Sequence, residues 1–367
     1  MKICIIAGAR PNFIKIAPII HAIHRAQKTG AKIQYRLVHT GQHYDTKMSD
    51  SFFRDLEIPH PHINLHCGGG SQAEQTAAIM VAFEKELLAN PADIVLVVGD
   101  VTSTMACAIV AKKLNTKVAH VEAGIRSFDL SMPEEINRMV TDSITDYFFT
   151  TSEFANKNLE KTGVNKSNIF FVGNVMIDTL LANEAKLRKP SIFDSLQLHP
   201  HQYFVVTLHR PSNVDDEINL RVIISEIVNN VEGLPVIFPM HPRTAKAFSK
   251  DCFQYSNLKV IEPLGYLEFN YLVKQAKAII TDSGGITEET TVMGVPCLTL
   301  RDNTERPETI EIGTNELVGT RVESIRKYLS ILLKNQWKKG AIPYLWDGKT
   351  ATRIIDKFLK IYENISN

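Results

Sequence analysis

The sequence has almost no net charge, because 41 lysines and arginines are balanced by 40 aspartates and glutamates over 367 residues. A chain that binds nucleic acid or an acidic membrane through its overall field needs a large excess of cations. We therefore expect no nucleic acid and no membrane among its main partners. An anionic ligand must instead be held by a local group of cations.

The sequence also has little cysteine and no long apolar run. Its five cysteines are an odd number and lie far apart, which predicts buried free thiols in a reducing compartment. No apolar stretch approaches the roughly 20 residues of a membrane span. The chain passes from Lys2 straight into a short strand without a cleavage pattern. These absences predict a cytoplasmic enzyme.

A dinucleotide-binding fingerprint and a metal-ligand cluster are absent as well. The first predicted strand runs into GARPNFIK, where a dinucleotide-binding protein has G-x-G-x-x-G. Arg10 at a helix N-terminus, with Lys15 a turn further on, suits a phosphate or diphosphate instead. The alternative is that both are solvated surface residues. We expect neither NAD nor a metal, and hence no cofactor.

Short β-branched runs alternate with longer helical patterns along the whole chain, which is typical of βαβ units. Two series of such units predict the α/β class, with two doubly wound Rossmann-like domains over residues 1–170 and 171–349. A final helical pattern, about 350–367, suits packing on either domain, and we expect it to return to the first. Facing sheets of this kind place their ligand-binding edges, the carboxyl ends of the strands, across one cleft.

Carboxylates follow two strands of the first domain and begin one of its helices. Asp100 ends the run DIVLVVGD, and Glu122 ends HVE. Glu134 and Glu135 follow Pro133 at a helix start. Asp100 alone suits a helix cap, and the glutamate pair alone suits dipole stabilisation. All of them together in half a domain favour an acid/base site.

In the second domain, one strand ends at His209 and Arg210, which combine a titratable ring with a permanent cation. Another strand ends in TDSGGITEE, where Ser283, Gly284 and Gly285 open a helix. Glycines at a helix start let backbone N–H groups approach a diphosphate, although a tight turn alone also explains them. A carboxylate just beyond them suits two ribose hydroxyls.

Nine segments, in order and over nearly the whole chain, resemble the non-hydrolysing UDP-N-acetylglucosamine 2-epimerase family. They are GARPNFIK, TGQHYDTKMS, VGDVTST, HVEAGIRS, MPEEINR, GNVMID, TLHR, TDSGGITEE and TERPETIEIGTNELVG. The resemblance implies a glycosyltransferase-B-like fold, a homodimer and reversible conversion of UDP-GlcNAc to UDP-ManNAc. It implies elimination and re-addition of UDP through a 2-acetamidoglucal intermediate. It also implies that the product is a precursor of bacterial surface polysaccharides.

The resemblance also implies roles for individual residues. The catalytic group would be Asp100, Glu122, Glu134 and His209. The residues that bind the UDP-sugar would be Arg10, Lys15, Phe269, Ser283, Gly284, Gly285, Glu289 and Arg306. A regulatory site for a second substrate molecule would include Gln42, Arg210 and His241.

Alternatives remain for the substrate and the reaction class. GARPNFIK and RSFDLSMPEEINR also resemble 2-epimerases of UDP-2,3-diacetamido-2,3-dideoxy uronic acids. A glycosyltransferase of the same fold would share the UDP-binding segment but would not need Asp100, Glu122 and Glu134 together. A non-catalytic nucleotide-sugar sensor gives no reason for these carboxylates.

Overall fold

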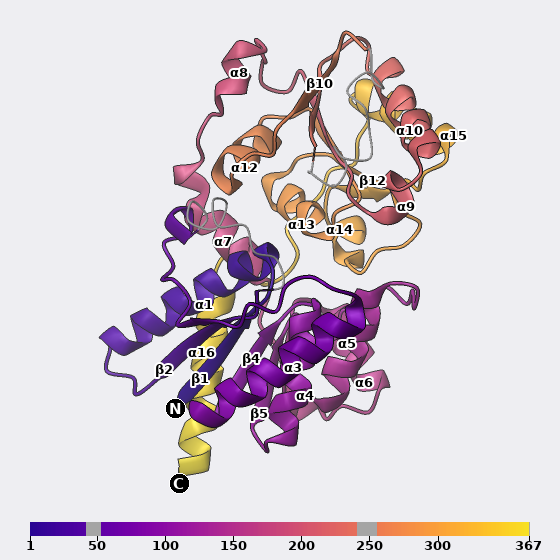
Figure 1. Cartoon of the computed structure of the whole chain (residues 1–367). Coiled ribbons are helices and arrows are strands. Elements are labelled where there is room, and N and C mark those ends of the chain that lie inside the picture. Colours follow the sequence, from indigo (N-terminus) through magenta and orange to yellow (C-terminus); the bar gives the residue numbers. More distant parts are fainter. Residues whose placement is uncertain (42–52, 241–254, 367) are drawn as a thin grey trace. The chain divides into compact units, whose positions relative to one another are not determined.

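The computed structural model describes residues 1–41, 53–240 and 255–366, and Figure 1 shows the order of their helices and strands. Each half of the chain forms a parallel β-sheet with helices packed against it, as the alternating patterns predict. No helix in these ranges is both long and apolar enough to cross a membrane.

The chain divides into two compact units, one of residues 1–182 with 344–367 and one of residues 183–343. The domains expected from the sequence, 1–170 and 171–349, therefore differ from these units at both boundaries where the chain passes from one unit to the other. The difference arises because the segments next to these two boundaries, residues 171–182 and 344–349, pack on the first unit.

The first unit contains a seven-stranded sheet in the order β3-β2-β1-β4-β5-β6-β7, with every pairing parallel. A strand inside such a sheet is covered on both faces and reads as a continuous apolar run. The five residues of β4, IVLVV, are accordingly all buried. The elements of the unit are β1 (Lys2–Ala7), α1 (Arg10–Lys28), β2 (Gln34–His39), β3 (Ile63–Asn64), α3 (Gln72–Ala89), β4 (Ile94–Val98), α4 (Thr102–Lys113), β5 (Lys117–Val121), α5 (Pro133–Ile144), β6 (Tyr147–Thr150), α6 (Glu153–Lys161), η1 (Lys166–Asn168), β7 (Ile169–Phe171), α7 (Val175–Asn183) and α16 (Thr350–Ser366).

Two hydrogen bonds attach these boundary segments to the rest of the first unit. Thr179 Oγ1, on α7, donates to the carbonyl oxygen of Ile14 at 2.6 Å. Trp346 Nε1 donates to the carbonyl oxygen of Thr151 at 3.1 Å, and the indole is almost fully buried. The chain therefore leaves and re-enters this unit through anchored segments.

The C-terminal helix α16 packs on the first unit, against α1. The rings of Phe358 and Phe149 lie 5.1 Å apart. The buried carboxylate of Asp178 accepts the backbone N–H groups of Thr350 (3.1 Å) and Ala351 (2.7 Å), which caps the start of the helix.

The second unit contains a six-stranded sheet in the order β10-β9-β8-β11-β12-β13, again with every pairing parallel. Apolar side chains of α10 and α15 pack on one face, and those of α8 and α12 belong to a second cluster. The elements are η2 (Glu184–Lys186), α8 (Ser191–Ser195), β8 (Phe204–Thr207), α9 (Pro211–Val214), α10 (Glu217–Asn229), β9 (Val236–Pro239), β10 (Leu258–Ile261), α12 (Tyr266–Lys274), β11 (Ala278–Thr281), α13 (Gly284–Met293), β12 (Cys297–Thr299), α14 (Pro307–Glu311), β13 (Asn315–Leu317) and α15 (Val322–Leu333).

Both sheets have a point at which the strand order reverses, and these points locate the candidate site. The reversal lies between β1 and β4 in the first unit and between β8 and β11 in the second. Open parallel sheets bind ligands at the carboxyl ends of the strands that flank such a point. The residues that follow these four strands are therefore candidates for binding a ligand.

Candidate active site

The turn after β1 is held against β4 by one buried side chain. Asn12 Oδ1 accepts the backbone N–H groups of Gly8 (3.1 Å) and Ala9 (2.9 Å), and Asn12 Nδ2 donates to the carbonyl oxygen of Val98 (2.9 Å). Arg10, the first residue of α1, is exposed on this turn. An exposed guanidinium at a helix N-terminus is suited to binding a phosphate group.

A buried ion pair joins α1 to the end of β5. Lys15 Nζ donates to Oε2 of Glu122 at 2.7 Å, and both side chains are largely buried. Gly99 leaves room for it, because an added Cβ there would lie 3.0 Å from Lys15 Nζ. Glu122 has a φ of +70°, a strained value for this residue type of the kind found at functional sites. Lys15, expected to contact a diphosphate, thus lies against an expected acid/base carboxylate.

Asp100, directly beyond β4, is bound by a buried arginine that the sequence analysis missed. Arg138, on α5, donates through its guanidinium to the carboxylate of Asp100, while Asn137 Nδ2 donates to the carbonyl oxygen of Asp100 at 2.8 Å. The N-cap of α4 is Val101, so Asp100 does not serve as the helix cap. Its carboxylate remains 30% exposed, which leaves it accessible to a ligand.

The two glutamates at the start of α5 have different environments. Glu134 is exposed, whereas Glu135 is buried and accepts the backbone N–H groups of Ser127 and Phe128, each at 3.0 Å. Burial alone would raise the pKa of Glu135, but these hydrogen bonds and the charge of Arg138 outweigh burial and lower the pKa. Glu135 therefore supports the loop as a carboxylate, and Glu134 is the one exposed to solvent.

In the second unit, Asp282 follows β11 and binds the segment after β8. Its buried carboxylate accepts the backbone N–H groups of His209 (3.1 Å) and Arg210 (2.9 Å) and the Nδ2 of Asn213 (3.0 Å). The Nδ1 of His209 lies 2.8 Å from Asp282 Oδ1. Burial would raise the pKa of Asp282, but its hydrogen bonds and His209 lower the pKa instead. Asp282, also missed from the sequence, therefore orients the half-exposed His209 ring.

The glycine pair opens α13 as the sequence predicts. Ser283 is the N-cap and makes no side-chain capping bond, and Gly284 and Gly285 are the first two helical residues. A Cβ added to Gly284 would lie 2.6 Å from Oε1 of Glu305, so no larger residue fits without displacing that carboxylate. Backbone N–H groups at a helix start without a side-chain cap are suited to an anion.

Arginines and glutamates alternate around the loop before α14. Arg301 donates to Glu305 at 2.7 Å, and the Nε of Arg306 pairs with Glu288. Burial would raise the pKa of Glu305, but the Arg301 hydrogen bond and the charges of Arg301, Arg306 and Arg210 lower the pKa to about 2. Glu305 is therefore ionised and holds the guanidinium groups in place.

Glu289 lies beside α12 in a different electrostatic setting. Its Oε1 accepts the hydroxyl of Tyr266 at 3.0 Å and lies 3.5 Å from Asn270 Nδ2. Burial raises the pKa of Glu289 to about 7, and these hydrogen bonds oppose only part of the effect. Phe269, on the same helix, is half-buried in the adjoining apolar cluster.

The residues predicted for a regulatory site are only partly described. Gln42 and His241 lie outside the described ranges. Arg210 Nε donates to the carbonyl oxygen of Asp282 at 3.0 Å, and its NH2 lies 3.7 Å from Oε1 of Glu305. Arg210 therefore belongs to the same charged cluster as His209.

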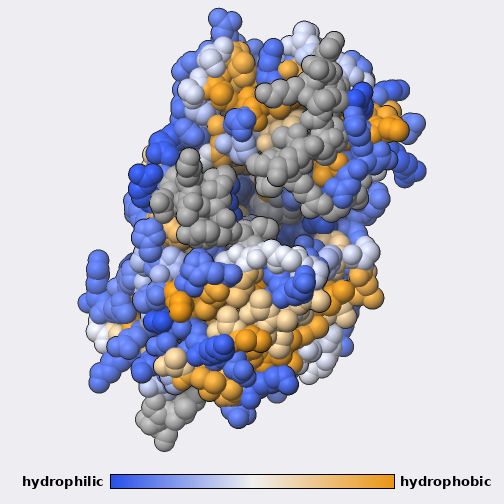
Figure 2. Space-filling view, in the orientation of Figure 1, coloured by the Kyte–Doolittle hydropathy of each residue, from blue (hydrophilic) through white to orange (hydrophobic). Residues whose placement is uncertain are grey.

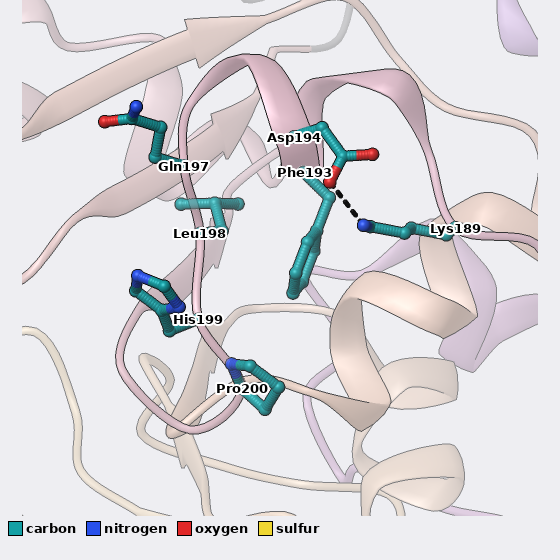
Figure 3. Close-up of a pocket in the computed structure, with 7 residues that line it drawn as sticks. All are labelled: Lys189, Phe193, Asp194, Gln197, Leu198, His199 and Pro200. Carbon is teal, nitrogen blue, oxygen red and sulfur yellow. Dashed lines mark hydrogen bonds and ion pairs between the residues drawn. The ribbon is translucent and has the colours of Figure 1, made fainter.

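A separate pocket lies on the second unit beside α8 (Figure 3). Its volume is about 620 Å³, and Lys189 and Asp194 form an ion pair at its rim. Both ends of this ion pair are well exposed, and the pocket contains none of the predicted site residues. Its lining residues are Lys189, Phe193, Asp194, Gln197, Leu198, His199 and Pro200.

The strand ends of the two units differ in their chemistry. The first unit carries Asp100, Glu122 and Glu134 at strand ends and a helix start, with buried cations beside the first two. Carboxylates in such positions are suited to proton transfer. The second unit presents an uncapped helix start with His209 and Arg306 on neighbouring loops, which suits a diphosphate.

Comparison with known proteins agrees with this chemistry. The family model described as UDP-N-acetylglucosamine 2-epimerase matches residues 25–359. The UDP-N-acetylglucosamine 2-epimerase of Methanocaldococcus jannaschii is 43% identical over 97% of this chain and 98% of its own length. A crystal structure of the enzyme from that organism in complex with UDP-GlcNAc and UDP is 42% identical, with a TM-score of 0.88, and covers 98% of this chain and 100% of the other.

A relative with a different substrate in its name is also similar over the full length. The UDP-2,3-diacetamido-2,3-dideoxy-D-glucuronate 2-epimerase of Pseudomonas aeruginosa is 38% identical over 98% of this chain and 99% of its own length. The expected fold class is confirmed, since both units are parallel-sheet α/β domains of the glycosyltransferase-B-like kind. The chain belongs to the UDP-N-acetylglucosamine 2-epimerase family, and it is an isomerase.

Proposed function

We propose that this protein interconverts UDP-GlcNAc and UDP-ManNAc. The observation that carries the proposal is the position of Asp100 and Glu122 at the ends of adjacent strands, each beside a buried cation. Full-length similarity to an enzyme named for this reaction supports it. The similar structure that contains UDP-GlcNAc and UDP supports the choice of ligand.

The proposed reaction proceeds by anti elimination and re-addition. A carboxylate removes the proton from C2, the electron pair forms the C1–C2 double bond, and the C1–O bond breaks with its electrons on the β-phosphate of UDP. UDP then attacks C1 of the 2-acetamidoglucal while a proton is delivered to the other face of C2. The sequence is redox-neutral and needs no further reactant.

Within this reaction we assign Asp100 and Glu134 as the proton-transfer pair. Both carboxylates are accessible, since the side chain of Asp100 is 30% exposed and Glu134 is an exposed residue. The side chain of Glu122 is 2% exposed, against 30% for Asp100, and this burial against Lys15 favours a supporting role for Glu122.

The departing diphosphate requires positive charge and N–H donors. Donors placed in advance where charge develops are worth several kcal/mol in a transition state. We assign this binding to Arg10, Lys15, His209, Phe269, Ser283, Gly284, Gly285, Glu289 and Arg306. Glu289 is proposed to accept the ribose hydroxyls, and a second-substrate site at Gln42, Arg210 and His241 stays a prediction.

A UDP-2,3-diacetamido uronic acid is the second candidate substrate. The 38% identity to the Pseudomonas aeruginosa enzyme over both full lengths favours keeping it. The reaction at C2 would be the same. We also propose a role in bacterial surface polysaccharide synthesis, as the resemblance to this family implies.

We also propose that the protein is a homodimer that pairs through α3 and α5. Figure 2 shows hydrophobic surface over the part of the first unit that carries these helices. Val81 and Leu88 on α3 are 57% and 62% exposed, and Ile136 and Met139 on α5 are 48% and 46% exposed. Apolar side chains gathered in this way are typical of a surface that a second copy covers.

The proposed function is tested by proton NMR of UDP-GlcNAc with the purified protein in deuterated water. Formation of UDP-ManNAc with deuterium at C2 is expected, because the abstracted proton exchanges with solvent before re-addition. Epimerisation without deuterium would contradict the elimination. Turnover of the diacetamido uronate but not of UDP-GlcNAc would move the assignment to the second substrate.

Replacement of the proposed acid/base residue should abolish turnover but leave nucleotide binding intact. Asp100→Asn keeps the shape of the side chain and removes its basicity, so we expect kcat to fall at least about 100-fold. UDP affinity, measured by calorimetry, should stay within about twofold of wild type, since the residues that hold UDP are elsewhere. Full activity of the variant would remove Asp100 from the mechanism.

The pKa of Glu289 predicts a pH dependence of UDP binding. Burial raises the pKa of Glu289 from its ordinary value of 4.5 to about 7. The contribution of protonated Glu289 to the free energy of unfolding is therefore fully present below pH 4.5 and is lost as the pH rises through 7. Ribose hydroxyls donate to the ionised form, so UDP affinity should rise by about tenfold from pH 6 to pH 8.

Glu289→Gln serves as the control for that pH dependence. Titration of UDP itself cancels in the difference between the two proteins. The variant should bind UDP more weakly, and its UDP affinity should rise less with pH than that of the wild type. Parallel curves for wild type and Glu289→Gln would contradict the assigned role.

The proposed dimer surface is tested by size-exclusion chromatography coupled to light scattering, which gives the mass of the protein in solution. Val81→Glu together with Leu88→Glu should give a monomer, because two carboxylates would be buried without partners. Ile218→Glu, at a 75% exposed position on α10 of the other unit, is the matched control and should remain dimeric. A monomeric wild type, or a dimer in the double variant, would overturn the proposed interface.

A further inference from the structure

A buried histidine on β5 connects two of the strand ends that carry the proposed acid/base groups. His120 is fully buried, and its Nε2 lies 2.8 Å from the carbonyl oxygen of Gly99. Its Nδ1 lies 2.7 Å from Oδ1 of Asp142, on α5. Carbonyl and carboxylate oxygens are both hydrogen-bond acceptors, so the ring lies between two acceptors. The ring therefore links the peptide that precedes Asp100 to α5.

The other oxygen of Asp142 holds the segment that follows Glu122. Asp142 Oδ2 accepts the backbone N–H of Gly124 at 3.0 Å and lies 2.6 Å from NH1 of Arg126. The same NH1 donates to the carbonyl oxygen of Ile125 at 2.8 Å. His120, Asp142 and Arg126 thus form one buried charge cluster, in which the carboxylate of Asp142 contacts both the ring and the guanidinium.

Each of the three proposed acid/base carboxylates belongs to a segment that this charge cluster holds. Asp100 follows the peptide bound by the ring, Glu122 lies two residues before the bound Gly124, and Glu134 lies on the same helix as Asp142. Glu122 has a φ of +70°, a conformation that persists only where surrounding contacts impose it.

We propose that His120, Asp142 and Arg126 are positioning residues that fix these three segments in one arrangement for proton transfer. The inference rests on the proposed function for its kinetic consequence. Buried ion pairs are often no more stabilising than apolar residues of the same volume, so stability alone does not account for one at this location. A catalytic group misplaced by about 1 Å can lose about 100-fold in rate.

The opposite end of β5 supplies a matched control. There Asp146 accepts the backbone N–H of Val118 at 2.9 Å and hydrogen bonds from Lys112 (2.9 Å) and Lys117 (3.0 Å). This network also joins an aspartate to a backbone N–H and two cations. It lies at the amino end of the strand, where none of the proposed acid/base residues are found.

The experiment compares Asp142→Asn with Asp146→Asn in the full-length protein. For Asp142→Asn we expect kcat to fall about 100-fold with KM within about twofold, because the proposed UDP contacts lie mostly in the other unit. For Asp146→Asn we expect a wild-type kcat even if the melting temperature falls. Equal loss of kcat in the two variants, or wild-type kcat in Asp142→Asn, would overturn the proposal.

Hydrogen exchange by mass spectrometry gives a readout that does not depend on activity. Peptides covering residues 97–101 and 122–128 should exchange faster in Asp142→Asn and at the wild-type rate in Asp146→Asn. Unchanged exchange in Asp142→Asn would refute the positioning role. If the wild-type protein showed no epimerisation, the proposed function would fail while the exchange result still decided the structural inference.

A second pair of variants applies if Asp142→Asn does not fold. His120→Gln keeps an N–H donor for the carbonyl oxygen of Gly99, whereas His120→Leu has none. We expect His120→Gln to retain at least about tenfold more of kcat than His120→Leu, in line with the loss that a misplaced group produces. Equal kcat values in two folded variants would contradict the assigned role of the ring.

Discussion

A buried carboxylate requires a cation or an N–H group beside it, and both units meet this requirement at the carboxyl ends of their strands. Lys15 lies against Glu122, and Arg138 against Asp100. In the second unit Asp282 accepts hydrogen bonds from backbone N–H groups of the segment after β8. Pairing of this kind fixes where each charge lies before any ligand binds, so hydrogen bonds and ion pairs add to apolar packing in holding the loops around the strand ends.

The division of charge between the units follows the proposed chemistry. The first unit combines accessible carboxylates with buried cations, as proton transfer requires. The second unit offers a glycine-lined helix start and an arginine-rich loop, as a diphosphate requires. Burial holds back the ionisation of Glu289, which has a pKa of about 7, and a ligand that donates hydrogen bonds to its carboxylate would relieve that effect.

Much of this arrangement is predictable from the sequence, since hydrophobic periodicity and strand-end motifs are local features. The two sheets, the site at Ser283 and the carboxylates Asp100 and Glu122 were predicted in that way. Partners distant in sequence were not: Lys15 and Glu122 are 107 residues apart. Arg138 lies in the segment MPEEINR, but only the fold joins it to Asp100. The boundaries of the units differ from the predicted ones at residues 170 and 349, where Thr179 and Trp346 make tertiary hydrogen bonds that no local pattern reports.

The central claim is that the bond between C1 and the oxygen of UDP breaks and re-forms during epimerisation. It is tested most directly with UDP-GlcNAc that carries 18O in the bridge between C1 and the β-phosphate. Elimination frees the β-phosphate to rotate, so 18O should migrate to a non-bridging position as UDP-ManNAc accumulates, which phosphorus NMR detects. Label that stays wholly in the bridge through many turnovers would contradict elimination and re-addition of UDP.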